Sequence, residues 1–214
     1  MNELSQGLNG IKEHAREVIP ADALATLTAE QRRYADRTDG FVKAGDTVPG
    51  FALPDATGAE VTLGELVSGG AAVLVFYRGQ WCPFCNLALR AYQEELSPKL
   101  AESGARLAAI SPQAPDGSLS TKEKNELGFA VLSDPGNEVA RSLGITFTPA
   151  AGVQDVMAAI GSDLTEHNAD GTWELPHPTV LVVDGTRTVR FADVHTDYTE
   201  RTEPREILAA LAAL

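Results

Sequence analysis

A continuous apolar run, AAVLVFY at residues 71–77, constrains the fold of this chain more than any other stretch. Apolar residues that follow one another without alternation are typical of a β-strand buried on both faces. Such strands belong to α/β sheets that carry helices on either side. The run therefore predicts a central sheet covered by helices on both faces.

Other segments extend this pattern. A helix is expected from Pro83 to about Glu102, with Pro83 in its first turn, where the missing N–H costs nothing. The remaining predicted elements are two short strands within 49–63 around a turn at Asp55 to Gly58, strands at 105–111 and 130–134, helices at 120–127, 137–143, 153–161 and 204–214, and antiparallel strands at 178–184 and 188–194 joined by a turn at Asp184-Gly185.

The first forty residues have a different pattern. Residues 2–19 show apolar positions at helical spacing, Pro20 interrupts, and a second helical stretch runs to about Arg37. We expect an N-terminal helical extension over 1–40 and an α/β domain over 41–214, with Gly40 and Gly45 marking the linker. Each apolar helix face must be buried on the domain or on a second subunit, which would make a homodimer. The apolar positions of the first helix are Leu4, Leu8, Ile11, Ala15 and Val18.

Charge and hydropathy exclude several classes of partner. The net charge is −13, from 17 basic and 30 acidic residues. Such a field repels phosphate backbones and anionic lipids, so we expect no nucleic-acid partner and no membrane partner. No apolar run approaches the roughly 20 residues of a membrane helix. The N-terminus lacks a basic start followed by an apolar stretch, so a secretory signal is not expected and a cytoplasmic location is.

The two cysteines, Cys82 and Cys85, lie three residues apart, just after the apolar run and at the start of the following helix. The free N–H groups and the positive dipole end of a helix start favour a thiolate and lower a thiol pKa from its free value of about 8.5. A thiolate is the nucleophile in disulfide exchange and in peroxide reduction. The spacing therefore predicts a redox-active dithiol that closes reversibly to a disulfide.

Three other interpretations of the cysteine pair compete. The pair could be two buried structural thiols, or a static disulfide, which a cytoplasmic location disfavours. It could also be half of a zinc site, but none of the four histidines has the spacing that such a site requires. No Gly-rich phosphate loop follows a strand and no acidic or histidine cluster has ligand spacing, so neither an organic nor a metal cofactor is expected.

The segment FYRGQWCPFCNLALRAYQ resembles the peroxiredoxin-like branch of the AhpC/TSA (alkyl hydroperoxide reductase and thiol-specific antioxidant) family. The resemblance covers the chain from about residue 43 to its end. It implies a thioredoxin-like fold, antioxidant hydroperoxide reduction and a thioredoxin-type electron donor. Further similar stretches are GDTVPGFALPDATGAEVTL, AISPQAPDGSLSTKEKNELGFAVLSDPGNEVARSLGI and VHTDYTERTEP.

Aligned with that family, Cys85 falls at the peroxidatic position, eight residues after Tyr77. The resemblance then implies that Cys85 becomes a sulfenic acid and that Cys82 resolves it. Cys82 falls where the family has Thr, and Arg78 where it has Pro. The family also has an Arg at the start of a later strand. Counted back from Asp184, its position falls on Pro178, so this Arg is expected to be missing.

The same departures resemble thioredoxin. Trp81-Cys82-x-x-Cys85 matches its Trp-Cys-x-x-Cys, and Pro178 is either the cis proline that faces the dithiol or an ordinary proline at a strand edge. In this alternative Cys82 is the nucleophile, a protein disulfide is the substrate, and His177 lies beside the cysteines or on the surface. A third alternative is a non-catalytic redox sensor that signals through the N-terminal helices.

Two arginines and a tryptophan complete the candidates for the site. Arg78 either lies near the thiolate and lowers its pKa or belongs to the solvated surface, and the surface is the default for Arg90. Trp81 either shields the dithiol, contacts a protein partner, or fills the core.

Overall fold

The computed structural model describes residues 3–35 and 37–214 and is built around a mixed five-stranded sheet in the order β5-β4-β3-β8-β9. β3, β4 and β5 are parallel, whereas β8 is antiparallel to β3 and to β9. This mixed sheet, flanked by helices, confirms the predicted fold class. The strands are β3 (Ala71–Phe76), β4 (Arg106–Ser111), β5 (Ala130–Ser133), β8 (Thr179–Asp184) and β9 (Val189–Val194).

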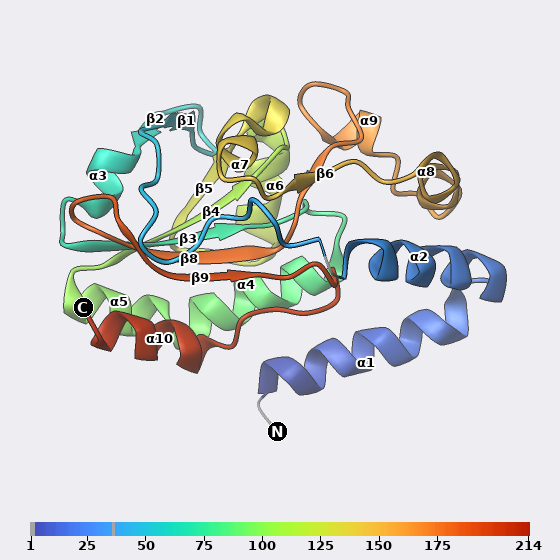
Figure 1. Ribbon diagram of the computed structural model, residues 1–214, viewed down its shortest axis with the longest axis horizontal. Coiled ribbons are helices and arrows are strands. Elements are labelled where there is room, and N and C mark those ends of the chain that lie inside the picture. Colours follow the sequence, from blue (N-terminus) through green and yellow to red (C-terminus); the bar gives the residue numbers. More distant parts are fainter. Residues whose placement is uncertain (1–2, 36) are drawn as a thin grey trace.

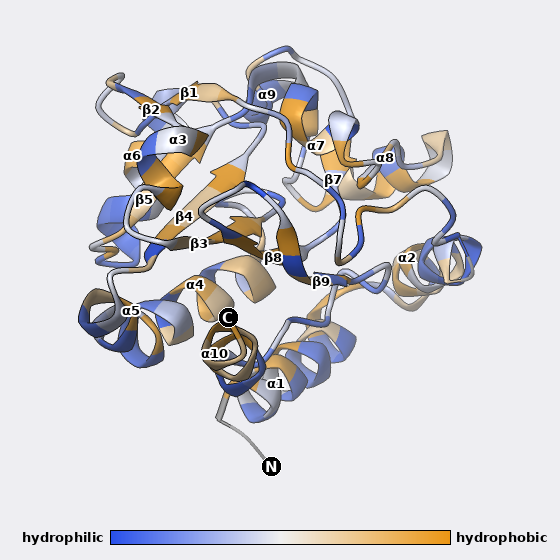
Figure 2. Ribbon diagram, turned by 60° about the vertical axis from the view of Figure 1, so that its left-hand side comes forward, coloured by the Kyte–Doolittle hydropathy of each residue, from blue (hydrophilic) through white to orange (hydrophobic). Residues whose placement is uncertain are grey.

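The central strand β3 is buried along its whole length and divides the core in two. Val73 and Val75 face one apolar layer, and Leu74 and Phe76 face the other. Figure 1 shows helices below and above the sheet, and Figure 2 shows the apolar strands between them. The lower layer holds α4 (Pro83–Glu95), α5 (Ser97–Ser103) and α10 (Pro204–Ala212), and the upper layer holds α3 (Leu63–Val67) and α7 (Glu138–Ser142).

The N-terminal helices pack against the domain at the end of the sheet where α4 begins (Figure 1). From α1 (Glu3–Val18), Leu4 and Leu8 enter the same apolar layer as α4. From α2 (Ala21–Tyr34), Leu27 packs against Val153 and Met157 of α8 (Ala151–Ala159). The two N-terminal helices therefore border the space beside the start of α4.

Some boundaries differ from those expected. The helix expected from Pro83 to Glu102 is two helices that meet at Leu96, because Pro98 has no N–H to continue the first. α6 (Pro115–Lys124) begins five residues before the expected start at 120, with Pro115 in its first turn. The helix expected at 153–161 is α8, two residues earlier.

The short elements are β1 (Ala52–Pro54), β2 (Glu60–Thr62), the 3-10 helix η1 (Pro135–Asn137), β6 (Thr146–Phe147), α9 (Leu164–His167) and β7 (Leu175–Pro176). β1 and β2 are the strand pair expected within 49–63. The pair β6 and β7 and the helix α9 lie in a region where the sequence has no readable pattern. Across residues 3–35 and 37–214, no helix is both long and apolar enough to cross a membrane.

Candidate active site

The dithiol lies where β3 passes into α4, as the sequence predicts. Cys82 caps the helix with extended backbone, and its carbonyl oxygen accepts hydrogen bonds from the N–H groups of Cys85 and Asn86, both at 3.1 Å. Both cysteines are free thiols with about 1% of their surface exposed. The first turn of α4 therefore holds the two sulfurs together inside the protein.

Arg201, which the sequence analysis did not identify, reaches this dithiol from the segment between β9 and α10. Its Nη2 lies 2.9 Å from the Sγ of Cys85 and 3.7 Å from the Sγ of Cys82. Its Nη1 donates a hydrogen bond to the carbonyl of Tyr198 at 2.8 Å, which fixes the guanidinium. Pro178 occupies the aligned strand position, so the Arg expected to be missing there is indeed absent, but Arg201 brings a positive charge to the dithiol from a loop.

The two thiols have opposite acidities. Burial alone would raise the pKa of Cys85, but a hydrogen bond from the Cys82 thiol and the charges of Arg201 and Arg78 hold it well below its usual value. Burial and the hydrogen bond to Cys85 raise the pKa of Cys82 well above its usual value. Cys85 therefore carries the negative charge, and Cys82 supplies the hydrogen-bond donor at the position where the family has Thr.

Arg78 is a buried residue of this site and not part of the solvated surface. Its side chain is enclosed between the rings of Trp81 and Tyr198, with the guanidinium carbon 4.6 Å from each ring centre. It is 6% exposed and contributes to the low pKa of Cys85. Arg90, by contrast, lies on the exposed side of α4 and donates to the Oδ1 of Asn125 at 3.0 Å.

The loop that carries Trp81 is held by the segment before α6 and by the first turn of α4. The Oε1 of Gln113 accepts a hydrogen bond from the N–H of Gln80 at 2.6 Å, and Asn86 donates to the carbonyl of Gln80 at 2.8 Å. Gly79 has φ +146°, and a Cβ there would lie 2.5 Å from the indole nitrogen of Trp81. Only glycine fits this turn without strain.

The resemblance to thioredoxin gave expectations for Pro178 and His177, and the two have different outcomes. No peptide bond of the described residues is cis, so Pro178 is not a cis proline; it directly precedes β8 as an ordinary proline at a strand edge. It still lines a small cavity together with Cys85 and Arg201. His177 is not on the surface: it stacks on Phe147 with 4.4 Å between ring centres, and burial and Arg78 lower its pKa to about 4.

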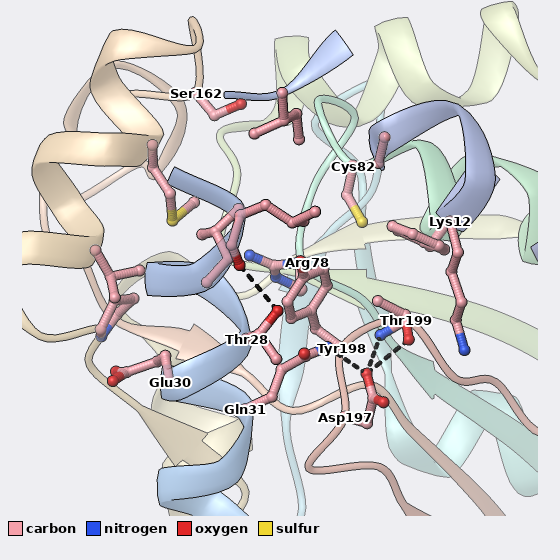
Figure 3. A pocket seen from close by; sticks show the side chains of 18 of the residues that line it. Lys12, Thr28, Glu30, Gln31, Arg78, Cys82, Ser162, Asp197, Tyr198 and Thr199 are labelled. Atoms are coloured by element: carbon pink, nitrogen blue, oxygen red, sulfur yellow. Dashed lines mark hydrogen bonds between the residues drawn. The ribbon is translucent and has the colours of Figure 1, made fainter. Parts of the chain in front are cut away.

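The two sulfurs face different spaces. Cys82 lines an open pocket of about 440 Å³, together with Arg78 and Trp81. Cys85 instead borders a cavity of only about 10 Å³. Figure 3 shows Cys82 and Lys12 of α1 on the right of this pocket and Thr28 of α2 on the left, with Arg78 between them.

No group of three or more His, Cys, Asp or Glu side chains is arranged to hold a metal ion in the part of the chain that the structure describes. The chemistry available to the described residues is that of a thiolate, a neighbouring thiol and two buried guanidinium groups.

Comparisons with known proteins point to one family. The sequence profile of the AhpC/TSA family matches residues 44–192. Peroxiredoxin Q of Triticum aestivum is 32% identical over 128 residues, which are 59% of this chain and 58% of that protein. Peroxiredoxin Bcp of Escherichia coli is 30% identical over 104 residues, which are 49% of this chain and 65% of that protein. The matches thus span somewhat less than two thirds of these relatives.

Solved structures agree. Peroxidoxin BcpB of Mycobacterium tuberculosis is 26% identical and superposes with a TM-score of 0.63, covering 81% of this chain and 98% of that one. A peroxiredoxin-like protein of Aquifex aeolicus shares the fold with a TM-score of 0.63 at 15% identity, over 81% of this chain and 88% of that one.

Proposed function

The chain belongs to the AhpC/TSA family, and we propose on this premise that it is a thiol peroxidase that reduces hydroperoxides with Cys82 and Cys85. The observation that carries the proposal is the contact of 2.9 Å between Arg201 and the Sγ of Cys85. A buried guanidinium beside a thiol favours the thiolate, which is the form that attacks a peroxide. Arg78 adds a second positive charge.

In the first step the Cys85 thiolate attacks the outer oxygen of the hydroperoxide. The S–O bond forms, the O–O bond breaks, and Cys85 becomes a sulfenic acid while an alkoxide leaves. The alkoxide is a strong base and takes a proton from the nearest acid. That acid is the Cys82 thiol, which already donates its hydrogen bond toward Cys85.

In the second step the Cys82 thiolate attacks the Cys85 sulfur and expels hydroxide, which is neutralised by the proton that Cys85 released to the solvent when it became a thiolate. The dithiol and one hydroperoxide thus give a disulfide, an alcohol and water. A thioredoxin-type donor, which family membership favours, then reduces the disulfide. Its thiolate would attack Cys82, which faces the open pocket, and expel Cys85, the thiol of lower pKa and the better leaving group.

The reaction would have an antioxidant role in a reducing compartment, and we assign it to the cytoplasm, where a close pair of thiols stays reduced between turnovers. No organic or metal cofactor takes part in this scheme, and a purified sample with stoichiometric metal or a flavin spectrum would contradict it.

The decisive experiment is a stopped-flow measurement of the reduced protein with hydrogen peroxide and with an organic hydroperoxide. We expect single-turnover oxidation far faster than that of free cysteine, with the loss of two hydrogens by mass spectrometry and recovery by a thiol reductant. A rate no better than a free thiol's would contradict the proposal. A dithiol that cycles without turning over substrate would favour the redox sensor.

Thioredoxin-like disulfide exchange is the second candidate. The observation that favours it is that Cys82, and not Cys85, lines the open pocket. Cys82 would then be the first nucleophile and Cys85 would resolve the mixed disulfide. Trapping of mixed disulfides on Cys82 in a Cys85→Ser variant distinguishes this activity from the first.

A further inference from the structure

Arg201 is held beside the dithiol mainly by the backbone of its own loop. Within the described part of the chain its guanidinium donates to the two cysteine sulfurs and to two backbone carbonyls, those of Tyr198 and Glu200. Both carbonyls belong to the loop between β9 and α10, so they move together with the arginine. Whether the guanidinium reaches the Sγ of Cys85 therefore depends on what fixes this loop to the rest of the protein.

Thr202, the residue after Arg201, fixes the loop to two elements of the core. Its carbonyl oxygen accepts a hydrogen bond at 2.7 Å from the hydroxyl of Tyr92, which is buried on α4. Its own hydroxyl donates at 2.8 Å to the Oδ2 of Asp193 on β9. Tyr92 lies about two turns after Cys85 on the same face of α4. The contact therefore holds the loop along the helix face that carries the inner sulfur.

His195 joins the same group of hydrogen bonds. Its Nε2 lies 3.1 Å from the Oδ2 of Asp193 and 3.2 Å from the Oγ1 of Thr202. The hydrogen bonds from His195 and Thr202 lower the pKa of Asp193 despite its partial burial, so its carboxylate is an acceptor. Because the threonine hydroxyl already donates to that carboxylate, Nε2 of the histidine must carry a hydrogen. We call Asp193, His195 and Thr202 the Asp193 cluster.

The Asp193 cluster lies on the Cys85 side of the dithiol. His195 and Thr202 line the small cavity of about 10 Å³ together with Cys85 and Arg201. The backbone N–H of His195 also donates to the carbonyl of Pro178 at 2.9 Å, which joins the cluster to the start of β8. All members of the cluster, like Arg201, follow the residues 44–192 that match the family profile, so that match assigns them no role.

We propose that Asp193, His195 and Thr202 are positioning residues that hold the Arg201 loop where its guanidinium stabilises the Cys85 thiolate. An arginine within a strand has its backbone fixed by the hydrogen bonds of the sheet. Arg201 lies on a loop, and the hydrogen bonds of Thr202 fix its backbone instead. This inference deepens the proposed function and rests on it for the peroxide kinetics, whereas the effect on the thiolate can be measured without any substrate.

The first measurement is the titration of Cys85 itself. Cys82→Ser leaves Cys85 as the only thiol of the chain and keeps a hydroxyl beside it. The ultraviolet absorbance of the thiolate, followed against pH in this full-length protein, gives the titration midpoint of Cys85. The ionisable groups that face Cys85 in addition to Arg201 are Cys82, Arg78, Tyr77 and Tyr92. Burial raises the pKa of both tyrosines, so they ionise at higher pH than the thiol.

Thr202→Val, made in the Cys82→Ser protein, keeps the shape of the side chain and removes its hydroxyl. It should raise the titration midpoint of Cys85 by about one pH unit, the scale on which a neighbouring opposite charge acts. Thr202→Ser keeps the hydroxyl and should titrate like the Cys82→Ser protein. Thr188→Val, just before the opposite end of β9, is the matched control and should leave the midpoint unchanged. A midpoint that Thr202→Val does not move would overturn the proposal.

Asp193→Asn tests the cluster at a side chain that is 33% exposed, where the fold tolerates the change. Removal of a negative charge would by itself lower the pKa of a nearby thiol. If the carboxylate instead holds Thr202 and the Arg201 loop, the midpoint of Cys85 should rise. The direction of the change therefore separates positioning from a direct effect of charge, and a lower or equal midpoint contradicts the role of Asp193.

Double variants show whether the cluster acts through Arg201. In the Arg201→Gln protein, Thr202→Val should move the midpoint no further, because no guanidinium is left to position. Equal shifts with and without Arg201 would mean that Thr202 affects the sulfur by another route, and the proposal would be wrong. Thermal unfolding of each variant identifies any that is not folded, and Asp193→Asn then replaces Thr202→Val in the same comparison.

Peroxide kinetics separate this inference from the proposed function. With both cysteines present, Thr202→Val should be oxidised more slowly than the wild type near the midpoint of Cys85 and approach the wild-type rate as the pH rises, because the thiolate then forms without help. A merely structural role would lower the rate equally at every pH. A shifted midpoint in a protein that reduces no peroxide would refute the proposed function and support the positioning role. Fast peroxide reduction with an unchanged midpoint would refute the positioning role alone.

Discussion

Cys82 and Cys85 lie within one turn of the same helix, yet the protein surrounds them in opposite ways. Cys85 faces inward to Arg201 and a cavity of about 10 Å³, whereas Cys82 faces an apolar pocket of about 440 Å³. The Arg201 guanidinium lies closer to the sulfur of Cys85, and most of the accessible volume lies beside Cys82. A dithiol enzyme needs a positive charge that stabilises its thiolate and enough space for its substrate. In this protein the first requirement is met at Cys85 and the second at Cys82.

This division explains why arguments from access and from alignment favour different nucleophiles. Access favours Cys82, the residue at the open end of the helix. Charge favours Cys85, because the hydrogen bond from Cys82 and the two arginines lower its pKa despite burial. If a proton passed from Cys82 to Cys85, Cys82 would become the thiolate and the two roles would be exchanged. The two cysteines must therefore be substituted one at a time.

The largest effect is expected from removing the charged sulfur. Cys85→Ser should abolish peroxide consumption, whereas Cys82→Ser should still undergo one fast oxidation that stops at the sulfenic acid, since no thiol remains to resolve it. Stopped-flow oxidation and trapping with a sulfenic-acid reagent measure the two. If instead Cys82→Ser is inert and Cys85→Ser traps mixed disulfides, Cys82 is the first nucleophile and Cys85 the resolving cysteine.

Removing the inner charge should have the next largest effect. Arg201→Gln should slow oxidation by Cys85 about 10²-fold or more, by analogy with the loss of one donor to a developing oxyanion. Arg190→Gln, on the exposed end of the sheet, is the control and should leave the rate unchanged. An equal rate in Arg201→Gln would mean that Arg78 alone maintains the thiolate.

The pH profile of the same variant sharpens this prediction. Because the pKa of wild-type Cys85 is lowered, its oxidation rate should fall only as the pH drops through that lowered pKa, at a lower pH than for an ordinary thiol. Without Arg201 the pKa rises, so the rate of Arg201→Gln should increase as the pH is raised above neutral. Profiles of the same shape would contradict the assigned role of Arg201.

A smaller effect is expected from Gly79, which shapes only the Cys82 side. Gly79→Ala forces an alanine to φ +146° and against Trp81, and should cost about 1–3 kcal/mol of unfolding free energy. Gly10→Ala is a matched control, because nothing lies within 4 Å of the added methyl group and alanine favours the helix. Urea denaturation compares them, and equal midpoints would show that the loop adapts without strain.

The buried strands of this protein can be predicted from the sequence more completely than its candidate active site. The unbroken apolar runs of β3 and β8 identify strands because burial dictates their residues. The spacing of Cys82 and Cys85 identifies the dithiol because local helix geometry is enough to bring them together. Arg201 has no such local signal: it lies 116 residues from Cys85 in sequence, and only the path of the chain after β9 brings it to the sulfur. The stretch VHTDYTERTEP contains it, but the resemblance did not indicate which residue mattered.

The smallest effect on the dithiol is expected from removing residues 1–40. This extension lines the pocket beside Cys82, and its hydrogen bonds to the segment that carries Arg201, from Ser5 to Glu203 and from Gln31 to Asp197, go to neighbours of the arginine. The truncated protein should therefore form its disulfide with hydrogen peroxide at a rate within about threefold of the full chain. It should nevertheless be less stable, because Leu4 and Leu8 are buried against α4 and their loss exposes apolar surface. Thermal unfolding, sedimentation and stopped-flow oxidation of the same preparation test both statements. A truncated protein that is still folded but cannot form the disulfide would show that Cys85 and Arg201 also depend on the extension. The surroundings of the two cysteines would then not be independent of each other.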